Sequence, residues 1–403
     1  MYRSFRRAVC LGLVSTVALA ICVTAGDARG SVQAEQGASS RQLRVAIVIP
    51  TSGPFGIHNR LIGNGATIAA NEINAQRMAK GRVPIRLKLN VVTVKPTASP
   101  KRILRALRRA STRVLILPCN VELQESLAHA ATKAGLLTLS PCNSDSKSAK
   151  NLPRYWPTGP TGAAEAAQLA FYAQSYAHAK TAFVLGAAGS WYARQMTSEL
   201  RAAATRNKIR VVGQASVPAG SQGIAALARR IRKVDPAVVF AAVPSPAVES
   251  IITQLRNWKV GAAFYVTDGM DAAINFLQYR DGPYNSSIED VVFATFGFPR
   301  PASGQFFRDY AEAYGKQPVG SFPGLGYETV HVLETAAQRA GSLTPTGLNA
   351  SFVKGFTVKG VALEDISYQG RGHRQPLTSV GLAQVIRDAY VPLFTSPAGH
   401  PSG

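Results

Sequence analysis

The sequence predicts an α/β protein built from two doubly wound parallel-sheet lobes that are joined by a hinge. Between residues 43 and 140, a short β-rich run is followed repeatedly by a turn and a longer stretch with helical apolar spacing. A Pro/Gly-rich passage at residues 152–160 interrupts this pattern, and the same alternation then restarts. Such alternation is typical of parallel sheets with helices on both faces. We interpret residues 152–160 as a crossover between the lobes.

The first series contains four expected strands, each of which ends at a polar or Gly/Pro-rich loop. They are Leu43–Ile49, Ile85–Val94, Val114–Leu117 and Leu136–Leu139. The first helix is expected at about Arg60–Asn74. Because open α/β sheets hold their ligands at the carboxyl ends of the strands, we expect a binding site in the loops that follow these strands.

The second series repeats the alternation of strands and helices, which gives way to a short β-rich segment near the end of the chain. Its expected strands are Thr181–Leu185, Ile209–Gly213, Ala237–Ala242 and Ala263–Thr267, and its expected helices include Gly223–Arg232 and Ala247–Trp258. Val291–Gly297 is then expected to lead into Phe306–Tyr314 and a helix at about Tyr327–Ala340, before a short β-rich ending. Residues 395–403 are small or polar and are expected to form a disordered tail.

The first residues have the features of an export signal. Arg3, Arg6 and Arg7 precede a mostly apolar stretch from Ala8 to Gly26, which is followed by small residues. We therefore expect a signal peptide at residues 1–26, with cleavage as late as about residue 34, and a periplasmic location. An uncleaved membrane anchor is the alternative, because the apolar stretch is almost long enough to cross a bilayer.

The chain is strongly basic, with 45 Lys and Arg residues against 22 Asp and Glu residues and a formal net charge of +23. Such a charge favours encounters with an anionic partner or surface. The densest basic run, Lys101–Arg113, is interpreted as an amphipathic helix with a solvated basic face, and a docking patch is the alternative. Nucleic-acid binding is not expected, because no motif that reads bases and no aromatic platform accompanies the charge.

The sequence lacks the residue patterns of common enzyme chemistry. It contains no phosphate-binding loop, no nucleophile elbow and no pair of metal-binding histidines. Gly63-Asn64-Gly65 lies inside a helical stretch, which disfavours a dinucleotide site. Cys119 and Cys142 form an even pair without the spacing of a zinc site, which is consistent with one disulfide in an oxidising compartment. We therefore expect no catalysis, no cofactor and no metal.

Several segments, in matching order, resemble a known family. The first strand is followed by Ile-Pro-Thr-Ser-Gly-Pro-Phe-Gly at residues 49–56 and by a helix with an Asn-rich end at residues 65–74. Later matches are Ser140-Pro141, Asp268-Gly269, Phe322–Tyr327 and the turn at residues 368–374. From about Leu43 to Phe394, the chain is therefore similar to the leucine/isoleucine/valine-binding family of ABC transporter receptors.

The resemblance implies the type I periplasmic binding fold, whose two lobes are joined by a multi-crossover hinge. Lobe 1 would comprise residues 43–156 and 296–366, and lobe 2 would comprise residues 157–295 and 367–394. The implied function is that of an extracytoplasmic substrate-binding protein, which closes on a small ligand and presents it to an ABC permease in the inner membrane. The implied ligand is a branched-chain amino acid or a related amide or carboxylate. The alternative is a sensory or dehydrogenase-associated binding protein of the same fold for an aromatic or other apolar ligand.

The resemblance also implies a set of ligand-binding residues. In that family, strand-end loops of lobe 1 hold the carboxylate and ammonium of the ligand, and lobe 2 adds an acid and aromatic side chains. The positions that match in lobe 1 are Ser52, His58, Asn120, Cys142, Asn143 and Ser144. Across the cleft, Trp191 or Tyr192 would supply the aromatic side chain. Asp268 would face an ammonium, and Phe322 would form an apolar wall near the hinge.

This chain departs from the family pattern at several of these positions. Asn120 replaces a serine, and Cys142-Asn143-Ser144 stands where amino-acid binders have small and hydroxyl residues. Residues 186–192 lack the usual acid, and Asp268 also fits the role of a turn cap or surface acid. The family fold would place Cys119 and Cys142 at the ends of neighbouring strands, where a disulfide would stiffen the floor of the cleft. Two unpaired thiols are the alternative to this bridge.

Overall fold

The computed structural model describes residues 41–53, 55–79, 85–119, 121–142, 152–217, 223–271, 288–298, 303–318, 320–370, 372–387 and 389–397. The expected signal peptide at residues 1–26 lies outside these ranges. Within them, no helix combines the length and the apolar character that a membrane span requires.

The first sheet has five parallel strands in the order β2-β1-β3-β4-β5. The strands are β1 (Arg41–Pro50), β2 (Ile85–Val94), β3 (Val114–Ile116), β4 (Leu137–Ser140) and β5 (Tyr155–Pro157), with α1 (Gly56–Ala79), α2 (Pro100–Arg109) and α3 (Val121–Lys133) between the first four. Side chains alternate along β1. Val45 and Ile47 pack with α1, whereas Ala46 and Val48 pack with α2 and α3. Helices therefore cover both faces of this sheet.

The passage at residues 152–160, interpreted as a crossover, also contains a strand. Tyr155–Pro157 pairs in parallel with β4 and forms the edge of the first sheet. Proline is accepted at this position because an edge strand leaves one row of main-chain groups unpaired. The crossover begins only after Pro157, one residue beyond the predicted end of lobe 1 at residue 156.

The second sheet has seven strands in the order β14-β13-β10-β9-β8-β6-β7. The strands are β6 (Thr181–Ala187), β7 (Arg210–Val217), β8 (Val238–Ala242), β9 (Ala263–Val266), β10 (Val292–Thr295), β13 (Ser379–Ile386) and β14 (Ala389–Pro397). The helices are α5 (Gly162–Ser175), α6 (Trp191–Arg206), α7 (Ile224–Val234) and α8 (Ala247–Asn257), with a 3₁₀ turn, η1, at Asp268–Met270. Helices α5 and α6 pack on one face, and α7 and α8 on the other.

The parallel pattern of the second sheet ends at β10. Strand β13 runs antiparallel to β10, and β14 runs antiparallel to β13. Strand β14 extends to Pro397, so the prediction of disorder from residue 395 is wrong for residues 395–397, because these residues pair with β13. Residues 398–403 lie outside the described part of the chain.

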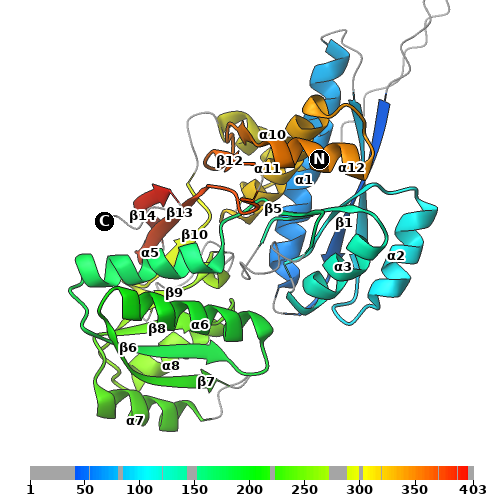
Figure 1. Cartoon of the computed structure of the whole chain (residues 1–403). Helices are drawn as coiled ribbons and strands as arrows, with labels where there is room; N and C mark the ends of the chain where they lie inside the picture. Colours follow the sequence, from blue (N-terminus) through cyan, green and yellow to red (C-terminus); the bar gives the residue numbers. More distant parts are fainter. Residues whose placement is uncertain are drawn as a thin grey trace, which may run out of the picture. The chain divides into compact units, whose positions relative to one another are not determined.

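Segments from the second half of the chain complete the first lobe. They are α10 (Gly304–Tyr314), α11 (Phe322–Arg339), α12 (Pro345–Lys354), β11 (Phe356–Val358) and β12 (Ile366–Tyr368). Figure 1 shows the yellow-to-orange helices α10 and α11 beside the blue helix α1, with α12 next to α11, and apolar side chains of all three join the core that contains β1. Tyr368 still belongs to this core, two residues beyond the predicted boundary at residue 366.

The chain passes from one lobe to the other three times, and the last passage starts from the two-stranded sheet that β11 and β12 form in the first lobe. The connections run from β5 to α5, from β10 to α10, and from β12 to β13. Each lobe is therefore made from separate stretches of sequence, and the three connections form the hinge.

Candidate ligand-binding site

Four predicted site residues come together where the two lobes meet, and with Phe55 they form the closure cluster. His58 lies in the first turn of α1, Tyr192 at the start of α6, Asp268 at the start of η1, and Phe322 at the start of α11. The ring of Phe55 lies 5.3 Å from that of Tyr192, and the ring of His58 lies 4.5 Å from that of Phe322. The closure cluster therefore joins first-lobe and second-lobe elements.

Tyr192 orients the acid of the cluster. The Ser190 side chain accepts a hydrogen bond of 3.2 Å from the main-chain N–H of Ala193 and so caps α6, which fixes the position of Tyr192. The Tyr192 hydroxyl donates to Oδ1 of Asp268 and lies 2.7 Å from Oγ1 of Thr267. Burial raises the pKa of Tyr192 well above its ordinary value, so its hydroxyl stays protonated and acts as a donor.

A second buried acid, Glu165 of α5, lies next to Asp268. The main-chain N–H of Asp268 donates to Oε1 of Glu165 over 2.5 Å. Burial raises the pKa of Asp268 to about 6, against the opposing effect of hydrogen bonds from Tyr192, Glu165 and the main chain of Gly269. Burial, and next the charge of Asp268, raise the pKa of Glu165 well above its ordinary value. Burial disfavours the charged form of both acids, and the hydrogen bonds that Asp268 accepts favour its carboxylate, so a negative charge on the pair lies on Asp268 rather than on Glu165.

This charge has no cationic partner in the described part of the chain. The ion pairs formed there involve other residues, His331 with Glu334 and Lys359 with Asp365. Asp268 is the first residue of η1, whose N-cap is Thr267, and its side chain is buried, so it is not the surface acid of the alternative interpretation. Its role toward a ligand stays a prediction.

His58 brings unused hydrogen-bonding capacity to the closure cluster. Its side chain is 1% exposed, and neither ring nitrogen makes a hydrogen bond. Burial lowers its pKa to about 4, although the nearby main chain of Gly269 acts in the opposite direction. The imidazole is therefore neutral at physiological pH and offers one donor and one acceptor among aromatic rings.

The Cys119–Cys142 disulfide lies beside the closure cluster. It joins the segments that follow the neighbouring strands β3 and β4, with the two Cα atoms 5.3 Å apart. Asn59, next to His58, accepts a hydrogen bond of 2.7 Å from the main-chain N–H of Cys119 and donates one of 2.7 Å to the main-chain oxygen of Phe55. The bridge is thus tied to the first turn of α1. Cys142 has no free thiol to offer a ligand.

The other predicted site residues are not gathered into this cluster. Ser52 is exposed on the loop between β1 and α1, and Trp191 is half-buried at the start of α6. Asn120, Asn143 and Ser144 lie outside the described residues.

Sequence reasoning missed two members of the site, Phe55 and Glu165. Phe55 follows the Ser-Gly-Pro loop that carried the resemblance, so an aromatic residue at the end of that motif was a usable signal. Glu165 is a single acid within Gly-Ala-Ala-Glu-Ala-Ala, and no sequence pattern indicated its burial, because glutamate is mostly exposed in folded proteins. The pairing of Glu165 with Asp268 gave no signal, because it depends on how α5 and η1 pack.

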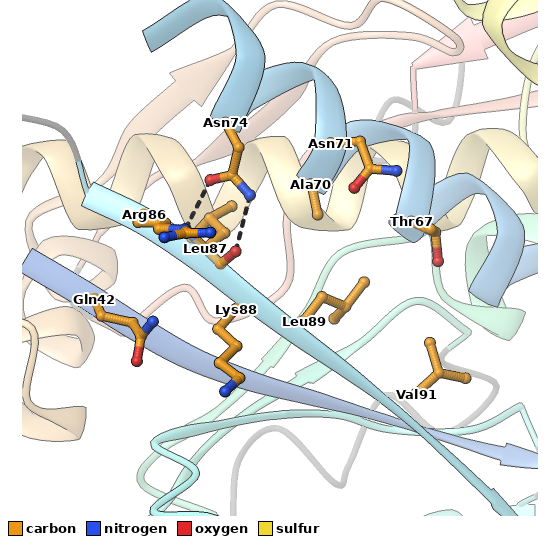
Figure 2. A pocket seen from close by; sticks show the side chains of 10 residues that line it. All are labelled: Gln42, Thr67, Ala70, Asn71, Asn74, Arg86, Leu87, Lys88, Leu89 and Val91. Atoms are coloured by element: carbon orange, nitrogen blue, oxygen red, sulfur yellow. Dashed lines mark hydrogen bonds between the residues drawn. The ribbon is translucent and has the colours of Figure 1, made fainter. Parts of the chain in front are cut away.

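A separate surface pocket of about 420 Å³ lies between α1 and β2 (Figure 2). The Asn74 side chain donates a hydrogen bond to the main-chain oxygen of Leu87 and accepts one from the main-chain N–H of Leu87, both over 2.9 Å. These bonds pair two main-chain groups that the edge strand β2 would otherwise leave without a partner. All of the described lining residues belong to the first lobe. Closure of two lobes would therefore not enclose a ligand in this pocket.

Among the described residues, no group of His, Cys, Asp and Glu side chains is suited to hold a metal ion. This holds for the three buried carboxyl groups near the closure cluster, Glu165, Asp268 and Asp271. The side chains of the closure cluster offer hydrogen bonding, charge and apolar contact to a ligand.

Comparisons with known proteins agree with this architecture. The leucine-binding protein LivK of Thermotoga maritima has a TM-score of 0.73 at 18% identity, over 88% of this chain and 98% of its own. LivJ of Streptococcus pneumoniae, in complex with isoleucine, has a TM-score of 0.73 at 16% identity, over 89% and 99%. A solute-binding protein of Rhodopseudomonas palustris BisB5, in complex with 3,4-dihydroxybenzoic acid, has a TM-score of 0.72 at 16% identity, over 90% and 99%.

At these identities, the solved structures show a shared fold. A search of curated proteins finds no match. The profile of the family described as "Periplasmic binding protein" matches residues 42–389, which is most of the chain. The chain therefore belongs to the periplasmic binding protein family and has the type I fold of ABC transporter substrate-binding proteins.

Proposed function

We propose that this chain is the extracytoplasmic substrate-binding protein of an ABC transporter and that it captures a branched-chain amino acid or a closely related amino compound. The observation that carries the proposal is the buried carboxylate of Asp268, which has no cationic partner among the described residues. A buried charge is costly unless an opposite charge or several hydrogen bonds compensate it. An ammonium group on the ligand would supply the missing charge.

The remaining side chains of the closure cluster suit the other parts of such a ligand. His58 is neutral and has a free donor for a carboxylate, and the rings of Phe55 and Phe322 offer apolar contact to an aliphatic side chain. A ligand that touches both lobes stabilises the arrangement in which they meet. A permease would recognise that closed form. Relatives of the same fold include a leucine-binding protein and a protein in complex with isoleucine, which supports this ligand class.

An aromatic carboxylic acid is the second candidate ligand. It is favoured by the aromatic rings of the closure cluster and by the relative that is in complex with 3,4-dihydroxybenzoic acid. An aromatic acid lacks an ammonium group, so it would leave the charge of Asp268 uncompensated. Its carboxylate would have to bind at a distance from Asp268, for example at His58.

Titration calorimetry with leucine, isoleucine, valine and 3,4-dihydroxybenzoate, on the wild type and on Asp268→Ala, tests the proposal. Removal of the acid should weaken amino-acid binding by roughly 3 kcal/mol, about a hundredfold in Kd, because the ligand ammonium would lose its buried partner. The control is Asp290→Ala, which removes an exposed acid of the second lobe and should leave Kd unchanged. Binding of 3,4-dihydroxybenzoate alone, at equal strength in the wild type and Asp268→Ala, would replace the first ligand class with the second.

A further inference from the structure

We propose that the hinge side of the molecule contains a second binding site, in a cavity of about 230 Å³, which takes a small aromatic amine. The cavity is lined by strands β10, β13 and β14 of the second sheet and by segments around α10 and α11 of the first lobe. None of the five residues of the closure cluster lines it. The site is therefore distinct from the one that binds the transported ligand.

The walls of this hinge cavity are suited to an aromatic ring. Phe293 and Tyr390 lie on the second-sheet side, where their ring centroids are 4.7 Å apart. Phe306 and Phe307 lie on the first-lobe side, with ring centroids 5.7 Å apart. A dry cavity of about 150 Å³ lined by apolar side chains holds benzene. The hinge cavity therefore has room for a benzene ring with a short substituent.

One end of the hinge cavity is acidic. Asp271 is 2% exposed, and its Oδ2 accepts hydrogen bonds from the Ser321 side chain, from the Ser321 main-chain N–H over 3.1 Å and from Thr295 Oγ1 over 2.9 Å. The described lining contains no Lys, Arg or His. The Ser321 hydroxyl donates to Asp271 and accepts from the main-chain N–H of Phe296, and the Thr295 hydroxyl donates to Asp271 or to the main-chain oxygen of Gly297. This end therefore accepts hydrogen bonds from a ligand and repels an anion.

Size, aromatic walls and an acidic end together define the ligand class. Glu249 adds to the acidic character of this end, since burial, and next the charges of Asp271 and Glu249, raise the pKa of Tyr390 well above its ordinary value. A ring would occupy the apolar part, and a protonated amine on a one-carbon arm would reach Asp271. Benzylamine has this form. Toluene has the ring without the amine, and benzoate has the ring with the opposite charge.

Binding of benzylamine, toluene and benzoate to the mature full-length protein, measured by calorimetry at pH 7.5, is the first part of the test. Benzylamine should bind, toluene should bind at least tenfold more weakly, and benzoate should not bind. Absence of benzylamine binding at millimolar concentration, or equal binding of all three compounds, would overturn the proposal.

Variants then show where benzylamine binds. Ala362 lines the hinge cavity, so Ala362→Leu fills it and should weaken benzylamine binding at least tenfold. Asp271→Asn removes the charge and should have a similar effect. Asp268→Asn serves as the matched control, because it changes the closure cluster and should leave benzylamine binding intact. Loss of binding in Asp268→Asn together with unchanged binding in Ala362→Leu would assign benzylamine to the cleft and refute a hinge site.

Discussion

Buried ionisable side chains at the lobe junction respond to pH in opposite directions. Burial raises the pKa of Asp268 and of Asp271 to about 6 and lowers that of His58 to about 4. The raised acids hold protons in the folded state that the unfolded chain has already released, so their contribution to stability declines as pH rises from about 4 to about 6. The contribution of His58 is complete above about pH 6.5 and is lost as pH falls toward 4.

The pH dependence of Asp271 can be isolated by substitution. Asp271→Asn cannot ionise, so its free energy of unfolding, minus that of the wild type, should increase as pH rises from about 4 to about 6 and then stay level. Urea denaturation at pH 4, 5, 6 and 7 measures this difference. Asn90→Gln, an exposed substitution that removes no ionisable group, should show a flat difference. A flat difference for Asp271→Asn as well would mean that its carboxyl titrates alike in the folded and unfolded chains.

The resemblance to a family pointed to four residues that the structure brings together at the lobe junction, and it could not provide their partners. His58, Tyr192, Asp268 and Phe322 follow strand ends or begin helices, which are positions that motif order can locate. Glu165, by contrast, meets Asp268 only because α5 packs on the second sheet with a particular rotation. Such a contact depends on tertiary packing, and a single sequence has no pattern that reports it.

At the scale of elements, the crossing of α1 and α11 shows how two glycines determine helix packing. A Cβ on Gly65 would overlap the main-chain oxygen of Pro323, and a Cβ on Gly326 would overlap that of Ile62. Each helix therefore rests on the backbone of the other, which only residues without a side chain allow. Gly65 is the last residue of the Gly63-Asn64-Gly65 pattern, and its role is close helix packing.

Gly65→Ala should therefore destabilise the protein by about 3 kcal/mol, because the added methyl group must push two backbones apart. Guanidinium denaturation followed by circular dichroism measures the change. Gly341→Ala is the matched control, since a Cβ there meets open space, and it should alter stability by less than about 0.5 kcal/mol. Equal stability of Gly65→Ala and the wild type would show that the helices are not in such close contact.

Long helices and strands with a clear apolar periodicity were predicted from the sequence, and some short strands without one were missed. Strand β2 was predicted at its observed bounds, Ile85–Val94, and the buried strands of both sheets were found to within a few residues. Strand β5 was missed because three residues, one of them Pro157, show no alternation to read. The β-rich ending was recognised, but its antiparallel pairing was not, because partner and direction depend on the rest of the sheet.

At the scale of the whole molecule, three crossings make each lobe discontinuous in sequence. The core of the first lobe combines β1 and α1 with α10, α11 and α12, which belong to the last third of the chain. Without those helices, the apolar side chains of α1, among them Leu61, Ile62 and Ala69, would face solvent. Neither lobe can therefore be cut out as one continuous piece.

A fragment of residues 41–157 should fail to fold, although it carries the whole first sheet. Joining it through a flexible linker to residues 303–370 should restore a cooperative thermal transition, because α11 then covers α1. Circular dichroism during heating distinguishes the two fragments. A cooperative transition in the shorter fragment would show that α1 does not need α11.

The same discontinuity in sequence determines the order in which parts of the protein can fold as the chain leaves the ribosome. Helix α1 is made early, yet its partner α11 emerges only after more than half of the chain has followed. The second sheet lies between them in sequence and waits in turn for β13 and β14 from the far end. The nascent chain therefore exposes apolar side chains throughout most of its synthesis. A chaperone that recognises apolar segments would find α1 available for that whole interval.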